Sequence, residues 1–131
     1  MIDVNQYNGM TLAYIGDAIY ELKIREHILS VGKTKVKELH SEALKYVSAI
    51  SQAHFMNYFL DNNILNETEV SIFLRGRNSH IKSNRKNVDL QTYLKATGFE
   101  SLFGYLYLTN NMTRIEELLL LIYDNVEEEN G

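Results

Sequence analysis

The chain has 131 residues, a net charge of −4 at pH 7, no cysteine and no proline. The lack of cysteine excludes disulfide frameworks and thiolate metal sites, and the length suits a single domain spanning residues 1–131. The acidic start "MIDVNQYNGM" argues against a signal peptide and no apolar run is long enough to span a membrane, so we expect a cytoplasmic protein with no membrane partner. Because a proline-free sequence suits long helices and no hairpin turn signal is present, we expect an all-α fold.

The first helix is predicted to begin within residues 8–11 and to end near Ser30. Gly32 follows it and is suited to a helix end. One apolar stripe at helical spacing runs along this helix, formed by Leu12, Ile15, Ile19 and Leu22.

Two further helices are predicted before the middle of the chain. Thr34 is a candidate N-cap for a second, long helix that continues toward Phe59, and "DNN" at residues 61–63 breaks it. Asn66 with Glu69 forms a cap pair for a third helix, "ETEVSIFLRGR".

The last helix is predicted to follow a second break, "TNN" at residues 109–111. Thr113 and Glu116 have the spacing of a capping box, and the helix continues through Val126. The acidic sequence "EEENG" at residues 127–131 is predicted to be a fraying tail.

The helix over residues 90–108, with Asp89 as its cap, is the most informative one. Its second half has almost no polar face, and a helix that is apolar all round is a buried helix. Glu100 lies in this helix, and Asp17 lies in the apolar first helix. Both carboxylates are therefore expected in buried surroundings, where an unpaired charge is costly.

Helical spacing alone leaves two interpretations of these acids open. Asp17 and Glu21 project from one side of the first helix, where a solvated face or a pair with Lys or Arg would explain them. Glu100 shares its face with no basic residue, so it needs either a basic partner from another helix or a hard cation. The sequence has no nucleophile elbow, no glycine-rich phosphate loop and no His pair at metal-binding spacing.

A basic segment lies between the two acidic helices. The stretch "RGRNSHIKSNRKNV" at residues 75–88 contains five basic residues and no acid, although the chain as a whole is acidic. Beyond the third helix the segment has no helical periodicity and is predicted to be a loop. Such a local patch is typical of a nucleic-acid contact, and the absence of acids favours this interpretation over a merely solvated loop. The candidate nucleic-acid-binding residues are Arg75, Arg77, Asn78, Lys82, Arg85 and Lys86.

Two motifs resemble the ribonuclease III catalytic domain. "LAYIGDAIYE" at residues 12–21 is similar to the family's helical Gly-Asp-Ala signature, which carries a metal-binding Asp. "TGFESLFGYLYL" at residues 97–108 resembles the later buried helix that carries the matching Glu. "RGRN" and "KNVDLQTY" also resemble the Mini-ribonuclease III branch, whose members have no double-stranded RNA-binding domain. The resemblance covers nearly the whole chain and implies the family's helical endonuclease fold as a homodimer.

The resemblance implies an endoribonuclease that hydrolyses double-stranded RNA with Mg²⁺, leaves a 5′-phosphate and needs no small-molecule cofactor. Asp17 and Glu100 carry over as catalytic and metal-binding residues, and Glu21 as a possible structural position. The implied substrate is the precursor of 23S ribosomal RNA. Two acidic positions of larger family members are Ala13 and Thr97 here, as in the Mini branch, so metal coordination must rely more on water and substrate phosphate.

Two other functions stay open. A non-catalytic RNA- or ribosome-binding helical dimer on the same fold would explain the uncharged Ala13 and Thr97. A helical dimerisation module with no RNA role would leave the basic segment unexplained. Metal-dependent cutting of RNA would separate the nuclease from both.

Overall fold

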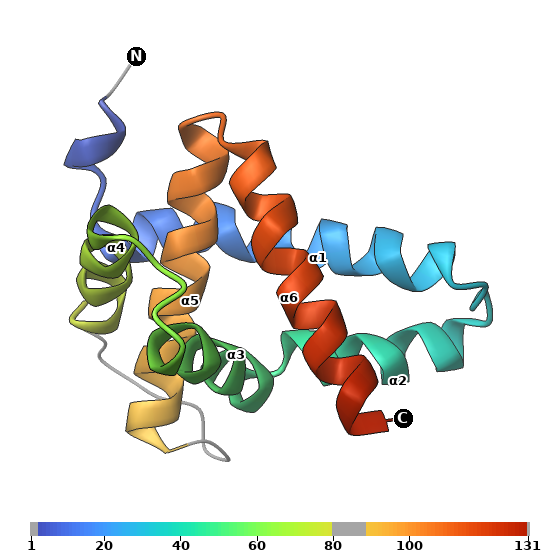
Figure 1. Cartoon of the computed structure of the whole chain (residues 1–131). Coiled ribbons are helices and arrows are strands. Elements are labelled where there is room, and N and C mark those ends of the chain that lie inside the picture. The colour runs from blue at the N-terminus through green and yellow to red at the C-terminus, as the bar shows by residue number, and fades with distance from the viewer. Residues whose placement is uncertain (1–2, 80–88, 131) are drawn as a thin grey trace.

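The structure is a computed structural model that describes residues 3–79 and 89–130, with side chains described as far as residue 128. Within these ranges no strand is present, and the predicted all-α fold is confirmed. None of the helices there is both long and apolar enough to cross a membrane. The elements, labelled in Figure 1, are a short 3₁₀ helix η1 (Val4–Gln6) and the helices α1 (Gly9–Ser30), α2 (Val36–Val47), α3 (Ala49–Asp61), α4 (Glu67–Arg77), α5 (Leu90–Leu108) and α6 (Met112–Asn130).

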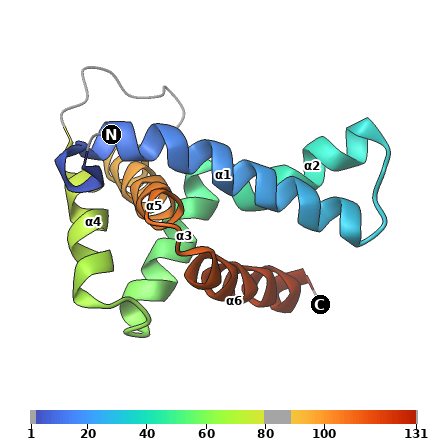
Figure 2. The same ribbon diagram turned by 90° about the horizontal axis from the view of Figure 1, so that it is seen from above.

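Helix α5 is the centre of the fold and lies between α4 and α6 in the two views of Figure 1 and Figure 2. Its most extensive packing is against α1, followed by α4 and α3. Tyr20 of α1 meets Phe99 edge-on with ring centroids 5.0 Å apart, and Phe59 of α3 stacks on the same ring at 6.3 Å. The prediction that residues 90–108 form a buried helix is confirmed, since Phe99 and Leu102 are fully buried.

Two glycines set the close crossing of α1 and α5. A methyl group at Gly16 would overlap the carbonyl oxygen of Glu100, and a methyl group at Gly104 would overlap that of Leu12. Only glycine, which has no Cβ, lets two helix backbones approach this closely. The crossing therefore places Asp17, which directly follows Gly16, near Glu100.

Most of the predicted helix ends are confirmed by their capping hydrogen bonds. Asn8 accepts from the backbone N–H of Thr11 at 2.8 Å, and Asp89 accepts from that of Thr92 at 2.9 Å. Asn66 and Glu69 form a complete capping box at the start of α4. Side-chain oxygens at these positions satisfy N–H groups that have no partner inside the helix.

The two predicted asparagine breaks are also confirmed. Asn63 follows α3 with φ 52°, and Asn110 follows α5 with φ 60°. Asparagine enters this left-handed region more easily than most residues because its short polar side chain bonds locally.

The prediction of one long helix from Thr34 toward Phe59 is wrong, because the chain breaks at Ser48 into α2 and α3. Ser48 has an extended backbone, with φ −64° and ψ 153°, and its side chain accepts from the backbone N–H of Ser51 at 3.1 Å. This cap starts a new helix, and α3 leaves in a different direction from α2 (Figure 1). The predicted cap Thr34 is also wrong, since α2 begins after Lys35, whose side chain makes no capping bond.

The start of the last helix differs from the prediction as well. Asn111, not Thr113, accepts from the backbone N–H of Arg114, at 3.2 Å. Glu116 instead forms an ion pair with Lys23 of α1 at 3.2 Å, so its charge joins two helices. The helix continues past Val126 to residue 130, where a fraying tail was predicted.

The apolar stripe predicted for α1 is only partly right. Leu12 and Ile19 face the core, but Leu22 is 53% exposed. The buried face is completed by Tyr20, Ile24 and Ile28. Because α1 carries apolar side chains on two sides, periodicity alone could not show which side meets α5.

Glu69 is a buried carboxylate on α4, with 2% of its surface exposed. The sequence predicted only a helix-capping role for it. It receives two hydrogen bonds from Arg114 of α6, at 2.7 and 2.9 Å. Burial opposes ionisation, but the bonds from Arg114 and from the backbone of Asn66 outweigh it and lower the pKa of Glu69. Arg114 also donates to the carbonyl of Ile64 at 2.7 Å, so this pair fastens α6 to the start of α4.

Candidate active site

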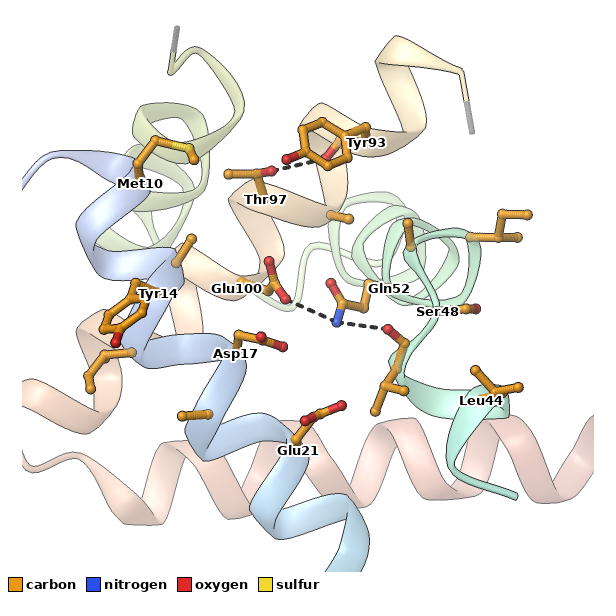
Figure 3. A pocket seen from close by; sticks show the side chains of 17 residues that line it. Met10, Tyr14, Asp17, Glu21, Leu44, Ser48, Gln52, Tyr93, Thr97 and Glu100 are labelled. Carbon is orange, nitrogen blue, oxygen red and sulfur yellow. Dashed lines mark hydrogen bonds between the residues drawn. The ribbon is translucent and has the colours of Figure 1, made fainter. Parts of the chain in front are cut away.

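A cleft of about 960 Å³ opens between α1, the junction of α2 with α3, and the first half of α5. Three carboxylates line it: Asp17 and Glu21 from α1, and Glu100 from α5. In Figure 3 all three side chains point into the same space, with Gln52 of α3 on the opposite wall. The sequence named Asp17 and Glu100 separately, and the structure brings them together.

Asp17 is exposed at the edge of the cleft, so the prediction of a buried carboxylate is wrong for this residue. Its position follows from Gly16, whose backbone packs directly on the backbone of Glu100. An exposed carboxylate needs no compensating partner from the protein. It is also open to a ligand that enters from solvent.

Glu100 is partly buried and is held from across the cleft by Gln52. The Gln52 Nε2 group donates to Oε2 of Glu100 at 3.5 Å and to the carbonyl oxygen of Val47 at 3.3 Å (Figure 3). Gln52 itself is only 2% exposed. The sequence analysis missed it, although a glutamine inside the apolar run "AISQAHFM" is a signal that a buried amide has a partner.

The two uncharged positions, Ala13 and Thr97, also line this cleft. The hydroxyl of Thr97 donates to the carbonyl of Tyr93 in its own helix at 3.1 Å, so this bond is local to α5. Among the described residues no group of three or more His, Cys, Asp or Glu side chains is arranged to hold a metal ion. Asp17 and Glu100 fit a magnesium ion that keeps several waters, because Mg²⁺ is commonly bound through only one or two carboxylates plus substrate phosphate.

Glu21 lies one helical turn beyond Asp17 on the same wall of the cleft. Its carboxylate forms an ion pair with Arg25 on the same helix at 3.6 Å, in line with the structural pairing that the sequence left open. The Glu21 side chain is 39% exposed, and exposed ion pairs contribute little to stability.

The basic segment is described only in part, because Lys82, Arg85 and Lys86 lie outside the described residues. Arg75 is half-buried in the last turn of α4, and its Nη1 group donates to the carbonyls of Tyr7 at 3.1 Å and Asn5 at 3.4 Å. This guanidinium therefore ties the N-terminal segment to α4.

Arg77 and Asn78 lie at the end of the same helix, close in sequence to residues 80–88, which lie outside the described residues. The Arg77 Nε group donates to the Asn78 side chain at 3.3 Å, and Asn78 is exposed.

Comparison with known proteins assigns the family. Residues 10–111 match the Ribonuclease III domain. The chain belongs to the ribonuclease III family. It is 46% identical to the Mini-ribonuclease 3 of Streptococcus pneumoniae over 97% of this chain and 99% of that protein, and 48% identical to the Mini-ribonuclease 3 of Enterococcus faecalis over 99% and 98%. These relatives place it in the Mini-ribonuclease 3 branch, as the sequence motifs indicated.

A solved structure agrees with this assignment. The crystal structure of a protein from Fusobacterium nucleatum superposes with a TM-score of 0.85 and 28% identity, covering 95% of this chain and 98% of that one. The family membership makes the chain an endoribonuclease. Asp17 and Glu100 both lie within the matched residues, and both line the cleft.

Proposed function

We propose that this endoribonuclease hydrolyses phosphodiester bonds of double-stranded RNA with Mg²⁺, and that Asp17 and Glu100 are its catalytic, metal-holding residues. One observation carries the proposal: carboxylates from two helices far apart in sequence line one open cleft. Asp17 comes from α1 and Glu100 from α5, and the cleft that they line has a volume of about 960 Å³.

In the proposed reaction the metal ion and the protein side chains have different roles. Bound Mg²⁺ would activate a water molecule and offset the charge that builds on the phosphate. Asp17, at the exposed edge, would contribute oxygen ligands where the RNA backbone enters. Glu100, half-buried on the wall formed by α5, would contribute a second, more constrained carboxylate. The products would be a 5′-phosphate and a 3′-hydroxyl.

RNA binding is assigned to the basic segment at the end of α4. A-form RNA is recognised mainly through its shape, its 2′-hydroxyls and its phosphates. Arg77 and Asn78 stand at the helix end and would meet phosphates together with the residues beyond them, while Arg75 also braces the N-terminal segment. The proposed RNA-binding residues are Arg75, Arg77, Asn78, Lys82, Arg85 and Lys86.

Exposed apolar side chains on α1 support the proposal of a homodimer. Tyr14 is 81% exposed, and Met10, Leu22 and Leu29 of the same helix are between 41% and 53% exposed. Several large apolar side chains left exposed on one helix favour a protein partner. A dimer packed around α1 would hold two sites and could cut both strands of a duplex.

The cellular substrate that we propose is the precursor of 23S ribosomal RNA, processed in the cytoplasm without a small-molecule cofactor. This proposal is supported by the resemblance of the motifs to the Mini-ribonuclease III branch.

The test is cleavage of a long duplex RNA with Mg²⁺, run with the wild type, with Asp17→Asn and with EDTA. We expect cutting by the wild type alone, and its loss on chelation. Retained RNA binding without any cutting by the wild type would instead support the non-catalytic RNA-binding dimer.

A further inference from the structure

We infer that Gln52 is a positioning residue that orients the Glu100 carboxylate for metal binding from the opposite wall of the cleft. The inference rests on the proposed function of Asp17 and Glu100. It adds a residue from α3 to a site otherwise built from α1 and α5, and it gives the break at Ser48 a role in catalysis.

The geometry of the Gln52 side-chain amide supports this positioning role. One nitrogen, Nε2, reaches two acceptors on different elements: the Glu100 carboxylate of α5 at 3.5 Å and the Val47 carbonyl at the end of α2 at 3.3 Å. An amide nitrogen has two hydrogens, so both bonds can be made at once. With the Val47 carbonyl fixing one direction, the second hydrogen is aimed at Glu100 (Figure 3).

The burial of Gln52 also supports this positioning role. Gln52 is 2% exposed, and a buried amide must have its hydrogen bonds satisfied by the protein. A side chain whose only task was to fill the core would be apolar at this position, as its neighbours Ala53 and Phe55 are. The Gln52 amide instead contacts a carboxylate that faces a cleft.

The break at Ser48 between α2 and α3 explains how the Gln52 amide is held. In a continuous helix the carbonyl of Val47 would accept from the backbone N–H of Ser51, four residues on. The Ser51 N–H instead bonds the side chain of Ser48 at 3.1 Å, and the Val47 carbonyl accepts from Gln52. The turn between α2 and α3 therefore anchors the amide that contacts Glu100.

The physical effect follows from what an outer hydrogen bond does to a metal ligand. A donor bonded to a ligating carboxylate fixes its orientation and favours its ionised form, and loss of such a partner typically weakens metal affinity or activity about 10–100-fold. We expect the same order of loss when the Gln52 amide is removed.

The experiment compares Gln52→Met, which keeps the length of the side chain but has no N–H donor, with the wild type and with Glu100→Gln. Asn57→Ala is the matched control, because Asn57 also lies on α3 and joins it to α5 by accepting from Lys95 at 2.6 Å, but on an exposed surface outside the cleft. For each protein we would measure Mn²⁺ binding by calorimetry without RNA, the Mg²⁺ concentration that gives half-maximal cleavage, and the melting temperature.

The expected result for Gln52→Met is Mn²⁺ binding weakened about 10-fold or more and a matching rise in the Mg²⁺ requirement, with kcat restored in part at high Mg²⁺. Asn57→Ala should keep wild-type metal binding. Equal metal binding in Gln52→Met and the wild type would overturn the inference while leaving the proposed function intact. If Gln52→Met does not fold, Gln52→Leu takes its place, and failure of both to fold makes Gln52 structural and refutes the inference. A wild type that binds no Mn²⁺ and cuts without metal would overturn the proposed function as well.

Discussion

Replacing Gly16 by alanine should both destabilise the protein and disable the site, because Gly16 sits where α1 crosses α5. The new methyl carbon would overlap the Glu100 carbonyl oxygen, and it would lie 2.7 Å from the Glu100 carbonyl carbon and 2.8 Å from the backbone nitrogen of Gly104. All three obstacles are backbone atoms, which cannot rotate away as a side chain could. The two helices would have to separate by about 2 Å to restore ordinary contact, and such overpacking costs about 3 kcal/mol.

The same separation moves Asp17 away from Glu100. A displacement of about 1 Å in a catalytic group lowers the rate about 100-fold. We therefore expect Gly16→Ala to lose about 3 kcal/mol in chemical denaturation and about 100-fold in cleavage rate at a temperature where it is fully folded.

Gly32→Ala is the control, because it adds a methyl group just beyond the end of α1, away from the crossing with α5. Gly32 has φ 96° and no atom within 4 Å of the added carbon, so the change strains only the backbone, by about 1–2 kcal/mol. Its cleavage rate should match that of the wild type. A Gly16→Ala protein with wild-type stability and cleavage rate would show that the close approach of α1 and α5 does not depend on Gly16.

Three other outcomes are expected. Arg114→Met should leave the Glu69 carboxylate, whose side chain is 3% exposed, without its cation, at a cost of about 3 kcal/mol or roughly 10 °C in melting temperature. Because the pKa of Glu69 is lowered on folding from its ordinary 4.5, the stabilisation by this pair is present above that pH and is lost as pH falls through the lower folded-state pKa. The difference between wild type and Arg114→Met in urea denaturation should therefore shrink in acid, and an unchanged difference would contradict the assignment. Tyr14→Asp should shift the protein toward monomer in light scattering, whereas a wild type that is already monomeric would contradict the proposed dimer. RNA affinity should fall steeply with salt through counterion release, and Arg77→Gln should reduce the slope of log affinity against log salt by about 1, whereas a flat salt response would contradict the role of the basic segment.

Local chemistry made several elements predictable. The caps at Asn66 and Asp89 and the breaks at Asn63 and Asn110 depend on a side chain bonding the backbone within four residues, so the sequence near each position determines them. The buried α5 was predictable because its second half is apolar on every side.

Other features depended on contacts between distant residues. Ser48 is followed by no glycine or proline, so the break there carried no strong sequence signal, and the packing of α3 on α5 favours it over a straight helix. The same holds for Glu69, which was assigned to a cap while its main partner, Arg114, lies 45 residues away.

For the site, the sequence by itself pointed to the residues that we propose for the chemistry: the acids of the two helical motifs and the basic segment between them. Only the tertiary structure decided that Asp17 is exposed and Glu100 partly buried, that they share one cleft, that Arg75 bonds the N-terminal backbone, and that Gln52 contacts Glu100. The reason is physical. A capping bond or an apolar face is set by neighbours along the chain, whereas burial and orientation are set by where a second backbone passes, and here two glycines fix that path.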